Sequence, residues 1–278
     1  MPVTLYQYMQ SLEMIRPAAA RSRLITGFYV LPASRLQGGC TAVSDGMPAI
    51  AFLPHPEDSI TFTTGNRAVA LTGAWISSQY LEKTTLQLQQ PAGELLIVRL
   101  NPVLFYQRWP LLPARLQQRV AWGLPELLGP DGATLLQQVA AATATTAKIH
   151  AIEAWMATQL QEQPGHNGLL ESVFSYICQR KGLTTVKELT AILGVNYKWL
   201  ERNFRYYTGL PPKLFLRQYR FLQASLALMY SHPVDFMAVA LEHGYYDQNH
   251  LIKEFRQFTG LAPGCFRERL REQGDCLL

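Results

Sequence analysis

The sequence predicts an α+β protein, with a β-rich N-terminal domain that ends in helices and an all-α C-terminal domain. Three observations predict this fold class. Short apolar or alternating segments fill residues 23–100, apolar residues at helical spacing dominate after residue 101, and one motif occurs twice in the last hundred residues. The chain has 278 residues, 48% of them hydrophobic, so it is long enough for two domains with cores of their own.

Six segments of the N-terminal half have the composition of β-strands. Gly, Pro, Asn and Asp separate them, which is typical of a sandwich or a small barrel. The segments are RLITGFYVLP, MPAIAFLP, SITFTT, RAVALTGAWI, TTLQLQQ and ELLIVRL.

From residue 101 onward the apolar residues follow a helical period. Helices are predicted in PARLQQRVAWGLPELLG and in GATLLQQVAAATATTAKIHAIEAWMATQLQEQ. The Ala/Thr run at 140–147 predicts a break between two helices, because Thr is a poor residue for a helix interior.

The segment EQPGHNG, residues 162–168, predicts the linker between the domains. We therefore expect an N-terminal domain over residues 1–163 and a C-terminal domain over residues 167–278. The C-terminal domain carries 14 Lys and Arg against 10 Asp and Glu, a net charge of +4, whereas the first 166 residues carry 11 against 10. The C-terminal domain is the better candidate for contact with a polyanion.

Cysteine spacing and hydropathy predict a cytoplasmic protein. The four cysteines lie far apart and form no C-x-x-C pair, which fits neither a zinc site nor a disulfide framework. The N-terminus lacks the basic start and the unbroken apolar run of a signal peptide. Since no apolar stretch is long enough to cross a membrane, we expect no membrane partner.

The last hundred residues contain one motif twice. The segment GVNYKWLERNFRYYTGLPPKLF (194–215) aligns with GYYDQNHLIKEFRQFTGLAPGCF (244–266), and from Asn196 and Asp247 onward the matched residues lie 51 positions apart. An internal repeat predicts one supersecondary unit that is used twice. In each copy a short helix ends at a glycine, and Asn196 or Asp247 then supplies the N-cap of a second helix.

Each copy therefore has the parts of a helix-turn-helix unit, at about residues 185–209 and 235–260. Leu and Phe at four and eight positions after the N-cap fall on one helix face, which we expect to be buried. The residues assigned to the core are Trp199, Leu200, Phe204, Leu251, Phe255 and Phe266.

The outward-facing residues of the second helices carry side chains that can read DNA bases. Arg and Lys donate to guanine, Gln and Asn pair with adenine, Glu accepts from cytosine, and Ile can touch a thymine methyl group. Polar residues in the first turn of a helix are also common as caps and solvated surface, and the matched second copy is what favours DNA. The base-reading candidates are Tyr197, Lys198, Glu201 and Arg202 in the first copy and Gln248, Asn249, Ile252 and Lys253 in the second.

Residues 211–231, between the two copies, predict one long connecting helix. Roughly 20 residues at ~1.5 Å each span about 30 Å. Successive major grooves on one side of B-DNA lie about 34 Å apart. One chain could therefore place both recognition helices in adjacent major grooves.

The repeated segments resemble the DNA-binding domain of AraC/XylS-type bacterial transcription regulators. GYYDQNHLIKEFRQFTGLAPGCFR is similar to their second helix-turn-helix, with its Gly-aromatic-x-Asp/Ser-Gln start, spaced Phe and Gly-x-x-Pro close, and VKELTAILGVNYKWLERNFRYYTGLPPKLFLRQYRF is similar to the first. The resemblance covers Leu169 to Arg271 and departs at Thr190, where Ala is common, and at Asn196, where Ser is commoner.

This resemblance implies a seven-helix DNA-binding domain joined to a β-rich domain for effector sensing or dimerisation. The implied function is sequence-specific transcription regulation through double-stranded DNA, without enzyme activity. Such a regulator is expected to be a homodimer and to have RNA polymerase as a further partner. Helices within residues 113–163 could pair two subunits.

Position in the motif also separates base contacts from backbone contacts. Tyr197 and Arg205 fall nearer the DNA backbone than Lys198, Glu201 and Arg202. Basic residues at phosphates position a protein without reading sequence, and each of them could equally be a solvated surface charge. The phosphate candidates are Arg205, Lys213, Arg217, Arg220, His250, Arg256 and Arg267.

The N-terminal domain supports a sensor hypothesis with few site residues. Mouths of barrels and sandwiches are common ligand pockets, although aromatic residues in such segments are more often core. The strand region holds a single histidine, His55, so we expect neither a metal site nor a cofactor. The effector-pocket candidates are Trp75, Tyr80, Phe105, Tyr106 and Trp109.

Two alternatives remain open beside an effector-sensing regulator. The first is a regulator without a small-molecule effector, controlled by a protein partner or by its own abundance. A closed, fully packed N-terminal interior would favour it, whereas an apolar cavity with a few polar groups would favour the sensor. The second is a base-modifying enzyme, which the sequence disfavours because it shows no nucleophile or metal constellation.

Overall fold

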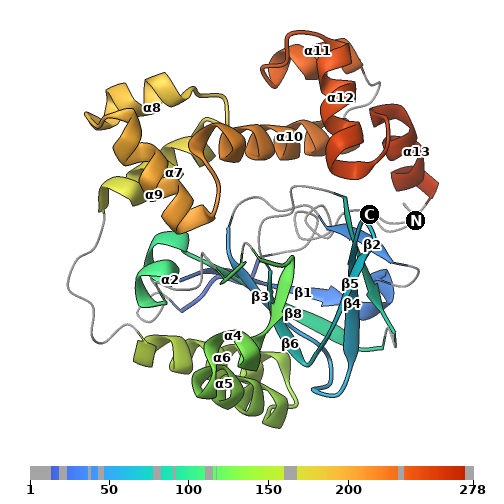
Figure 1. Ribbon diagram of the computed structural model, residues 1–278. Coiled ribbons are helices and arrows are strands. Elements are labelled where there is room, and N and C mark those ends of the chain that lie inside the picture. Colours follow the sequence, from blue (N-terminus) through green and yellow to red (C-terminus); the bar gives the residue numbers. More distant parts are fainter. Residues whose placement is uncertain are drawn as a thin grey trace.

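The computed structural model describes most of the chain (Figure 1). The described residues are 14–18, 24–36, 39–42, 47–77, 83–89, 92–109, 115–116, 118–159, 168–230 and 235–272. They form a β-rich N-terminal domain with helices, followed by an all-α C-terminal domain, which confirms the predicted fold class.

Two antiparallel sheets form the frame of the N-terminal domain. The first has the strand order β1 (Ile25–Pro32), β8 (Glu94–Leu100), β3 (Ala49–Phe52), β6 (Ala74–Ser77) and β9 (Ala121–Gly123). The second has the order β2 (Cys40–Ala42), β7 (Thr84–Leu88), β4 (Ser59–Thr64) and β5 (Arg67–Thr72). A short 3-10 helix, η1 (Ala33–Leu36), follows β1.

Burial on one face or on both faces explains the sequence pattern of the strands. In β8, Leu95 and Ile97 pack with the core between the sheets, whereas Leu96 and Val98 pack with the helices on the other side. Since both faces are buried, β8 is almost entirely apolar. Burial in β4 alternates along the strand, because only one of its faces packs on the core.

Helices cover the outer face of the first sheet. They are α2 (Pro102–Arg108), α4 (Leu124–Leu128), α5 (Pro130–Ala141) and α6 (Thr145–Gln159). In Figure 1, α4, α5 and α6 lie together below this sheet, on the side opposite the C-terminal domain. The predicted break at the Ala/Thr run is confirmed, because α5 ends at Ala141 and Ala142 is extended, with φ −88° and ψ 127°.

Two sequence expectations in this domain were wrong, and one strand was missed. RAVALTGAWI forms two strands and not one, because Gly73 between them has φ +68° and turns the chain. The segment expected to be helical around Trp122 contains strand β9, which pairs with β6 at the edge of the sheet. Strand β2 was not predicted, and at three residues it depends on its pairing with β7.

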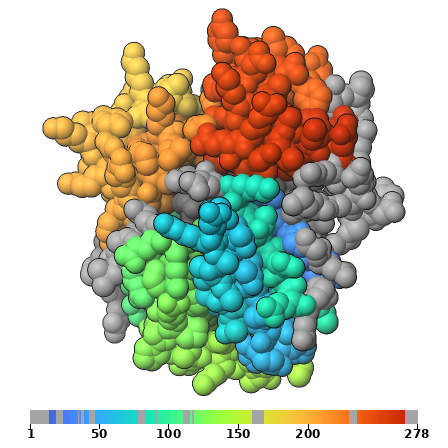
Figure 2. Space-filling model, turned by 45° about the vertical axis from the view of Figure 1, so that its right-hand side comes forward, coloured from blue at the N-terminus to red at the C-terminus, as the bar shows by residue number. Residues whose placement is uncertain are grey.

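Seven helices make up the C-terminal domain within the described residues. They are α7 (Gly168–Gln179), α8 (Val186–Leu193), α9 (Tyr197–Thr208), α10 (Pro212–Tyr230), α11 (Phe236–Glu242), α12 (Gln248–Thr259) and α13 (Pro263–Glu272). We call α8 with α9 the first unit and α11 with α12 the second unit. The helix α10 joins the two units, and Figure 2 shows them as two projections with a notch between them.

The N-terminal domain contacts both units. Helix α2 packs against α9. The Asn101 side chain caps α2 by accepting from the Val103 amide at 2.9 Å, and its Nδ2 donates to Glu171 Oε1 on α7 at 3.0 Å. At the second unit, the aliphatic part of Lys83 lies against Gly260, which ends α12. Across the described residues, no helix is long and apolar enough to cross a membrane.

Candidate nucleic-acid interface

Local capping residues determine where the helices of the first unit begin and end. Thr185 accepts from the Glu188 amide at 3.1 Å, while the Glu188 carboxylate accepts from the Thr185 amide at 2.8 Å, which forms a capping box at the start of α8. The bond from the Thr185 amide, and next a bond from the Thr184 hydroxyl, lower the pKa of the Glu188 carboxyl group. Gly194, with φ +62°, ends α8, and Asn196 then accepts from the Trp199 amide at 2.9 Å. The N-cap predicted for α9 is confirmed.

The second unit repeats this arrangement with different residues. Asp235 caps α11 by accepting from the amides of Met237 at 2.9 Å and of Ala238 at 3.0 Å. Gly244, with φ +68°, turns the chain, and Asp247 accepts from the His250 amide at 2.8 Å to cap α12. The carboxylate at the N-terminus of α12 also interacts favourably with the helix dipole.

The recognition helices α9 and α12, the second helices of the two units, end in turns with matching hydrogen bonds, which we call corners. Thr208 Oγ1 donates to the Phe204 carbonyl at 2.7 Å and accepts from the Leu210 amide at 3.1 Å. Thr259 does the same at the end of α12, with 2.7 Å to the Phe255 carbonyl and 3.1 Å to the Leu261 amide. The repeat in the sequence is therefore a repeat in hydrogen-bond geometry as well.

Aromatic clusters hold each recognition helix on the rest of its unit. Around α9, the rings of Phe174, Phe204 and Phe215 have centroids 5.4 to 5.5 Å apart. Around α12, Phe221 packs on Phe255 at 4.8 Å and on Phe258 at 4.6 Å. The residues predicted to be core are buried, except Trp199, which is half-buried and packs against the same core.

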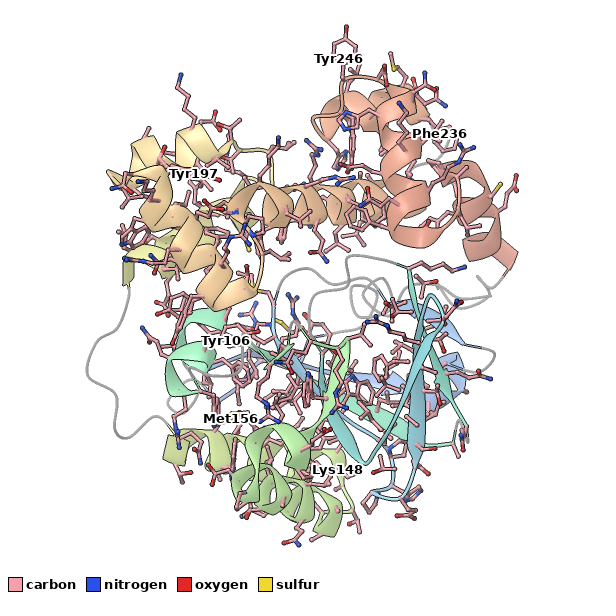
Figure 3. All side chains as sticks on the ribbon, viewed as in Figure 1. Tyr106, Lys148, Met156, Tyr197, Phe236 and Tyr246 are labelled. Atoms are coloured by element: carbon pink, nitrogen blue, oxygen red, sulfur yellow. The ribbon has the colours of Figure 1, made fainter. Side chains whose placement is uncertain are left out.

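The N-terminal ends of α9 and α12 lie on the side of the C-terminal domain that faces away from the β-sheets (Figures 1 and 3). Their C-terminal ends contact the N-terminal domain through α2 and Lys83. Six of the eight base-reading candidates are exposed, and the other two, Glu201 and Ile252, are half-buried. The structure thus brings each predicted set of four together on one exposed helix face.

One exposed side chain at this surface was not among the sequence candidates. Tyr246 is 87% exposed, directly before the N-cap Asp247, and it projects from the top of the second unit in Figure 3. Its neighbour Tyr245 is buried. The doubled Tyr in GYYD was the available signal, and the structure buries the first Tyr and exposes the second.

The phosphate candidates fall into different environments. Lys213 and Arg256 are exposed, and Arg267 is half-buried. Arg205 is exposed and forms an ion pair with Glu201 within α9, at 3.2 Å. His250 is exposed, and its ring meets the ring of Tyr245 edge to face.

The remaining two, Arg217 and Arg220, turn toward the buried carboxylate of Glu254. Arg217 Nε donates to Glu254 Oε1 at 2.6 Å, and Arg220 Nη2 donates to the same oxygen at 3.3 Å. Arg217 also donates to Gln257. Sequence reasoning missed Glu254, because a Glu between Lys253 and Phe255 on a helix looks like a solvated charge.

The structure brings three effector-pocket candidates together and separates a fourth from them: the ring centroid of Phe105 lies 5.2 Å from that of Tyr106 and 4.9 Å from that of Trp109. Trp75 is buried between the two sheets and meets Phe62 edge to face at 5.6 Å. Phe105, Tyr106 and Trp109 belong to the core on the other side of the first sheet. Burial raises the pKa of Tyr106 strongly, so its phenol stays protonated. Tyr80 lies outside the described residues.

A groove of about 540 Å³ lies elsewhere, between α7 and α8. Its lining includes Glu171, Tyr176, Leu189 and Ile192, and none of the effector-pocket candidates. Within the described residues, no group of three or more His, Cys, Asp or Glu is arranged to hold a metal ion.

A comparison with protein-family models matches part of the C-terminal domain. Residues 189–269 match the family model described as "Helix-turn-helix domain", which is of the AraC type. No curated protein matches the chain in sequence.

Solved structures with a similar arrangement include ToxT from Vibrio cholerae, with 9% identity, 88% of this chain and 93% of that chain covered, and a TM-score of 0.46. The DNA-binding domain of AdpA in complex with a target DNA has 26% identity, coverage of 38% and 96%, and a TM-score of 0.36. The C-terminal domain of the response regulator yesN from Fusobacterium nucleatum has 22% identity, coverage of 36% and 99%, and a TM-score of 0.34. On this family match and its two capped units, the C-terminal domain contains a DNA-binding helix-turn-helix domain of the AraC type over residues 189–269.

Proposed function

We propose that this regulator reads DNA by placing α9 and α12 in successive major grooves of one duplex. The observation that supports this most directly is that both helices present exposed N-terminal ends on the same side of the domain. The helix α10 that joins the units has 19 residues, which span about 28 Å at ~1.5 Å each. Adjacent major grooves on one face of B-DNA lie about 34 Å apart, so the two units fit consecutive turns.

Each recognition helix has its own proposed base contacts. In α9, Lys198 and Arg202 are exposed donors suited to guanine, while Glu201 can accept from cytosine. In α12, Gln248 and Asn249 suit adenine. Lys253 is a further donor on α12, half-buried Ile252 can contact a thymine methyl group, and Tyr197 lies nearer the backbone of the first block.

Proposed phosphate contacts come from exposed basic residues around these helices. Lys213, Arg205 and Arg256 have exposed side chains. Arg205 pairs with Glu201 in the structure, and a DNA phosphate could compete with this carboxylate for the guanidinium group. His250 and Arg267 remain proposed at the edge of this surface. We do not propose phosphate contacts for the two arginines that pair with Glu254, because leaving a buried carboxylate unpaired would be costly.

For the N-terminal domain, residues 1–163, we propose sensing and dimerisation, with residues 167–278 as the DNA-binding domain. The partners proposed on this basis are a second copy of the chain, RNA polymerase and a small-molecule effector. The alternative is a regulator controlled by a protein partner or by its own abundance. Burial of Trp75, Phe105 and Tyr106 in packed cores favours this alternative over an aromatic pocket at these residues.

A selection from random duplex DNA with the purified full-length protein, followed by footprinting of the enriched sequences, tests the two-groove proposal. We expect two recurring blocks about one helical turn apart. Arg202→Ala should relax the first block alone and Gln248→Ala the second block alone, each at about 1–3 kcal/mol per lost base contact. Recovery of one block only would show that the other helix does not read sequence, and the proposal would be rejected.

A further inference from the structure

A buried carboxylate lies at the centre of the second recognition helix. Glu254 is only 2% exposed, and it accepts from Arg217 Nε at 2.6 Å, from Arg220 Nη2 at 3.3 Å and from Tyr245 Oη at 2.8 Å. A charge in such a place is stable only when it is paired and fully hydrogen-bonded. The side chain of Glu254 therefore faces the interior of the unit, away from a DNA surface.

The partners of Glu254 come from two other segments of the chain. Arg217 and Arg220 lie three residues apart on α10, so they project from one face of the joining helix. Tyr245 belongs to the turn before α12, and Arg220 also lies over its ring at 4.5 Å and donates to the Gly244 carbonyl at 3.3 Å. One carboxylate thus ties the recognition helix to both the turn and α10.

The groups around Glu254 are hydrogen-bond donors that keep their protons. Burial raises the pKa of Tyr245, and the neighbouring negative charge of Glu254 raises it further, so the phenol keeps its proton. Guanidinium groups stay protonated throughout the accessible pH range. His250 Nε2, 3.9 Å from Glu254 Oε1, is the fourth group around the carboxylate and faces solvent.

Within the part of the chain that the structure describes, the first unit has no carboxylate at the position equivalent to Glu254. At the position 51 residues before Glu254 stands Asn203, whose Nδ2 donates to the Trp199 carbonyl of its own helix at 2.8 Å. The contact between α9 and α10 runs through apolar rings, such as Phe204 against Phe215. Apolar contacts are non-directional, whereas charge-assisted hydrogen bonds from Arg fix a geometry.

We propose that Glu254 is a positioning residue that fixes the orientation of α12 on α10, and that it thereby sets the spacing between the two DNA blocks. Its consequence for DNA rests on the two-groove function proposed above. The fixed geometry between the two units is a property of the protein alone and does not depend on that function. Glu254 itself touches no DNA, and it acts through the helix that carries Gln248 and Asn249.

The first experiment measures the geometry without DNA. Full-length protein with its native cysteines replaced by serine or alanine carries spin labels at Lys198→Cys and Asn249→Cys, both at exposed positions. We expect a narrow distribution of label-to-label distances, which broadens in Glu254→Gln. The matched control is Glu201→Gln, which removes an ion pair within α9 and should leave the distribution unchanged.

A folded Glu254→Gln protein with an unchanged distribution would overturn the proposal. If Glu254→Gln does not fold, Arg217→Gln takes its place, because the carboxylate then keeps Arg220 and Tyr245 as partners. Arg217→Gln is expected to broaden the distance distribution less than the removal of the Glu254 carboxylate would. No broadening in Arg217→Gln would equally count against the proposal.

The second experiment measures DNA spacing. Affinities are compared for duplexes that carry both selected blocks at the selected spacing and with one base pair added or removed. In Glu254→Gln the preference for the selected spacing should fall roughly tenfold, equivalent to about 1.4 kcal/mol, with base preferences inside each block unchanged. An equal loss at every spacing would show a merely structural role. If the wild-type protein selects one block only, the two-groove function fails, while the distance measurement still decides the role of Glu254.

Discussion

Replacement of Thr208 by Val at the end of the first recognition helix should destabilise that corner more than replacement by Ser. Thr208 is buried, and its hydroxyl both donates and accepts: it donates to the Phe204 carbonyl, with the Leu210 carbonyl as a second, longer acceptor at 3.3 Å, and it accepts from the Leu210 amide. Thr208→Val keeps the volume and removes both bonds. At about 1 kcal/mol for each net hydrogen bond, and with the buried Leu210 amide left without an acceptor, the cost is about 2 kcal/mol.

Thr208→Ser is the control, because it keeps the hydroxyl and removes one methyl group, at a cost of about 0.8 kcal/mol. Amide hydrogen exchange at Leu210 is the assay. A local cost of about 2 kcal/mol corresponds to exchange faster by roughly thirtyfold. Thr259→Val should produce the same effect at Leu261, which has the equivalent bond at 3.1 Å, and none at Leu210.

The reasoning would be refuted if Thr208→Val protected the Leu210 amide as well as Thr208→Ser does. That result would mean that methyl packing and not the hydroxyl holds the corner. Faster exchange at both corners from a single substitution would also contradict it, because it would show that the two units open together and not locally.

Three further predictions follow from the caps, the turn and the exposed tyrosine. Asn196→Ala and Asp247→Ala should each cost about 1 kcal/mol of stability and weaken only the DNA block of their own helix, as shown by thermal melts and footprints. Burial lowers the pKa of His243 from 6.5. The hydrogen bond between the His243 ring and the Val239 carbonyl has the opposite, smaller effect on this pKa. Stability should therefore hold above pH 6.5 and fall as the pH drops below that value, and His243→Gln should flatten the melting temperature measured between pH about 8 and about 5. Tyr246→Ala should lower the affinity for DNA, because Tyr246 is exposed at this surface. Tyr246→Phe should lower it only if the hydroxyl contacts a phosphate. Equal affinities for the wild type and both variants would show that Tyr246 does not contact DNA.

The parts of the fold with local signals were predictable from the sequence. The caps at Asn196 and Asp247, the glycine turns, and the buried Leu and Phe of each recognition helix follow from residue type and spacing, and the structure confirms them. Strand β9 (Ala121–Gly123) was not predictable, because three residues acquire strand geometry only from their pairing with β6.

The roles of individual side chains were harder to predict than the helices that carry them. Arg217 and Arg220 carry the same charge as Lys213 on the same helix, and only the three-dimensional position of Glu254 separates their environments. Aromatic residue type likewise did not distinguish a pocket from a core, as Trp75 shows. The base-reading set remains a prediction that the exposure of these side chains supports and that the DNA selection tests.

Asn101 gives the boundary between the domains a particular mechanical character. One amide group both caps α2, through its oxygen, and binds Glu171 on α7, through its nitrogen, so the same side chain orders the start of α2 and the contact between the domains. A flexible tether would allow the two lobes to drift through a continuum of separations. The bond from Asn101 to Glu171, together with the packing of α2 on α9, instead gives the two domains a specific docked arrangement.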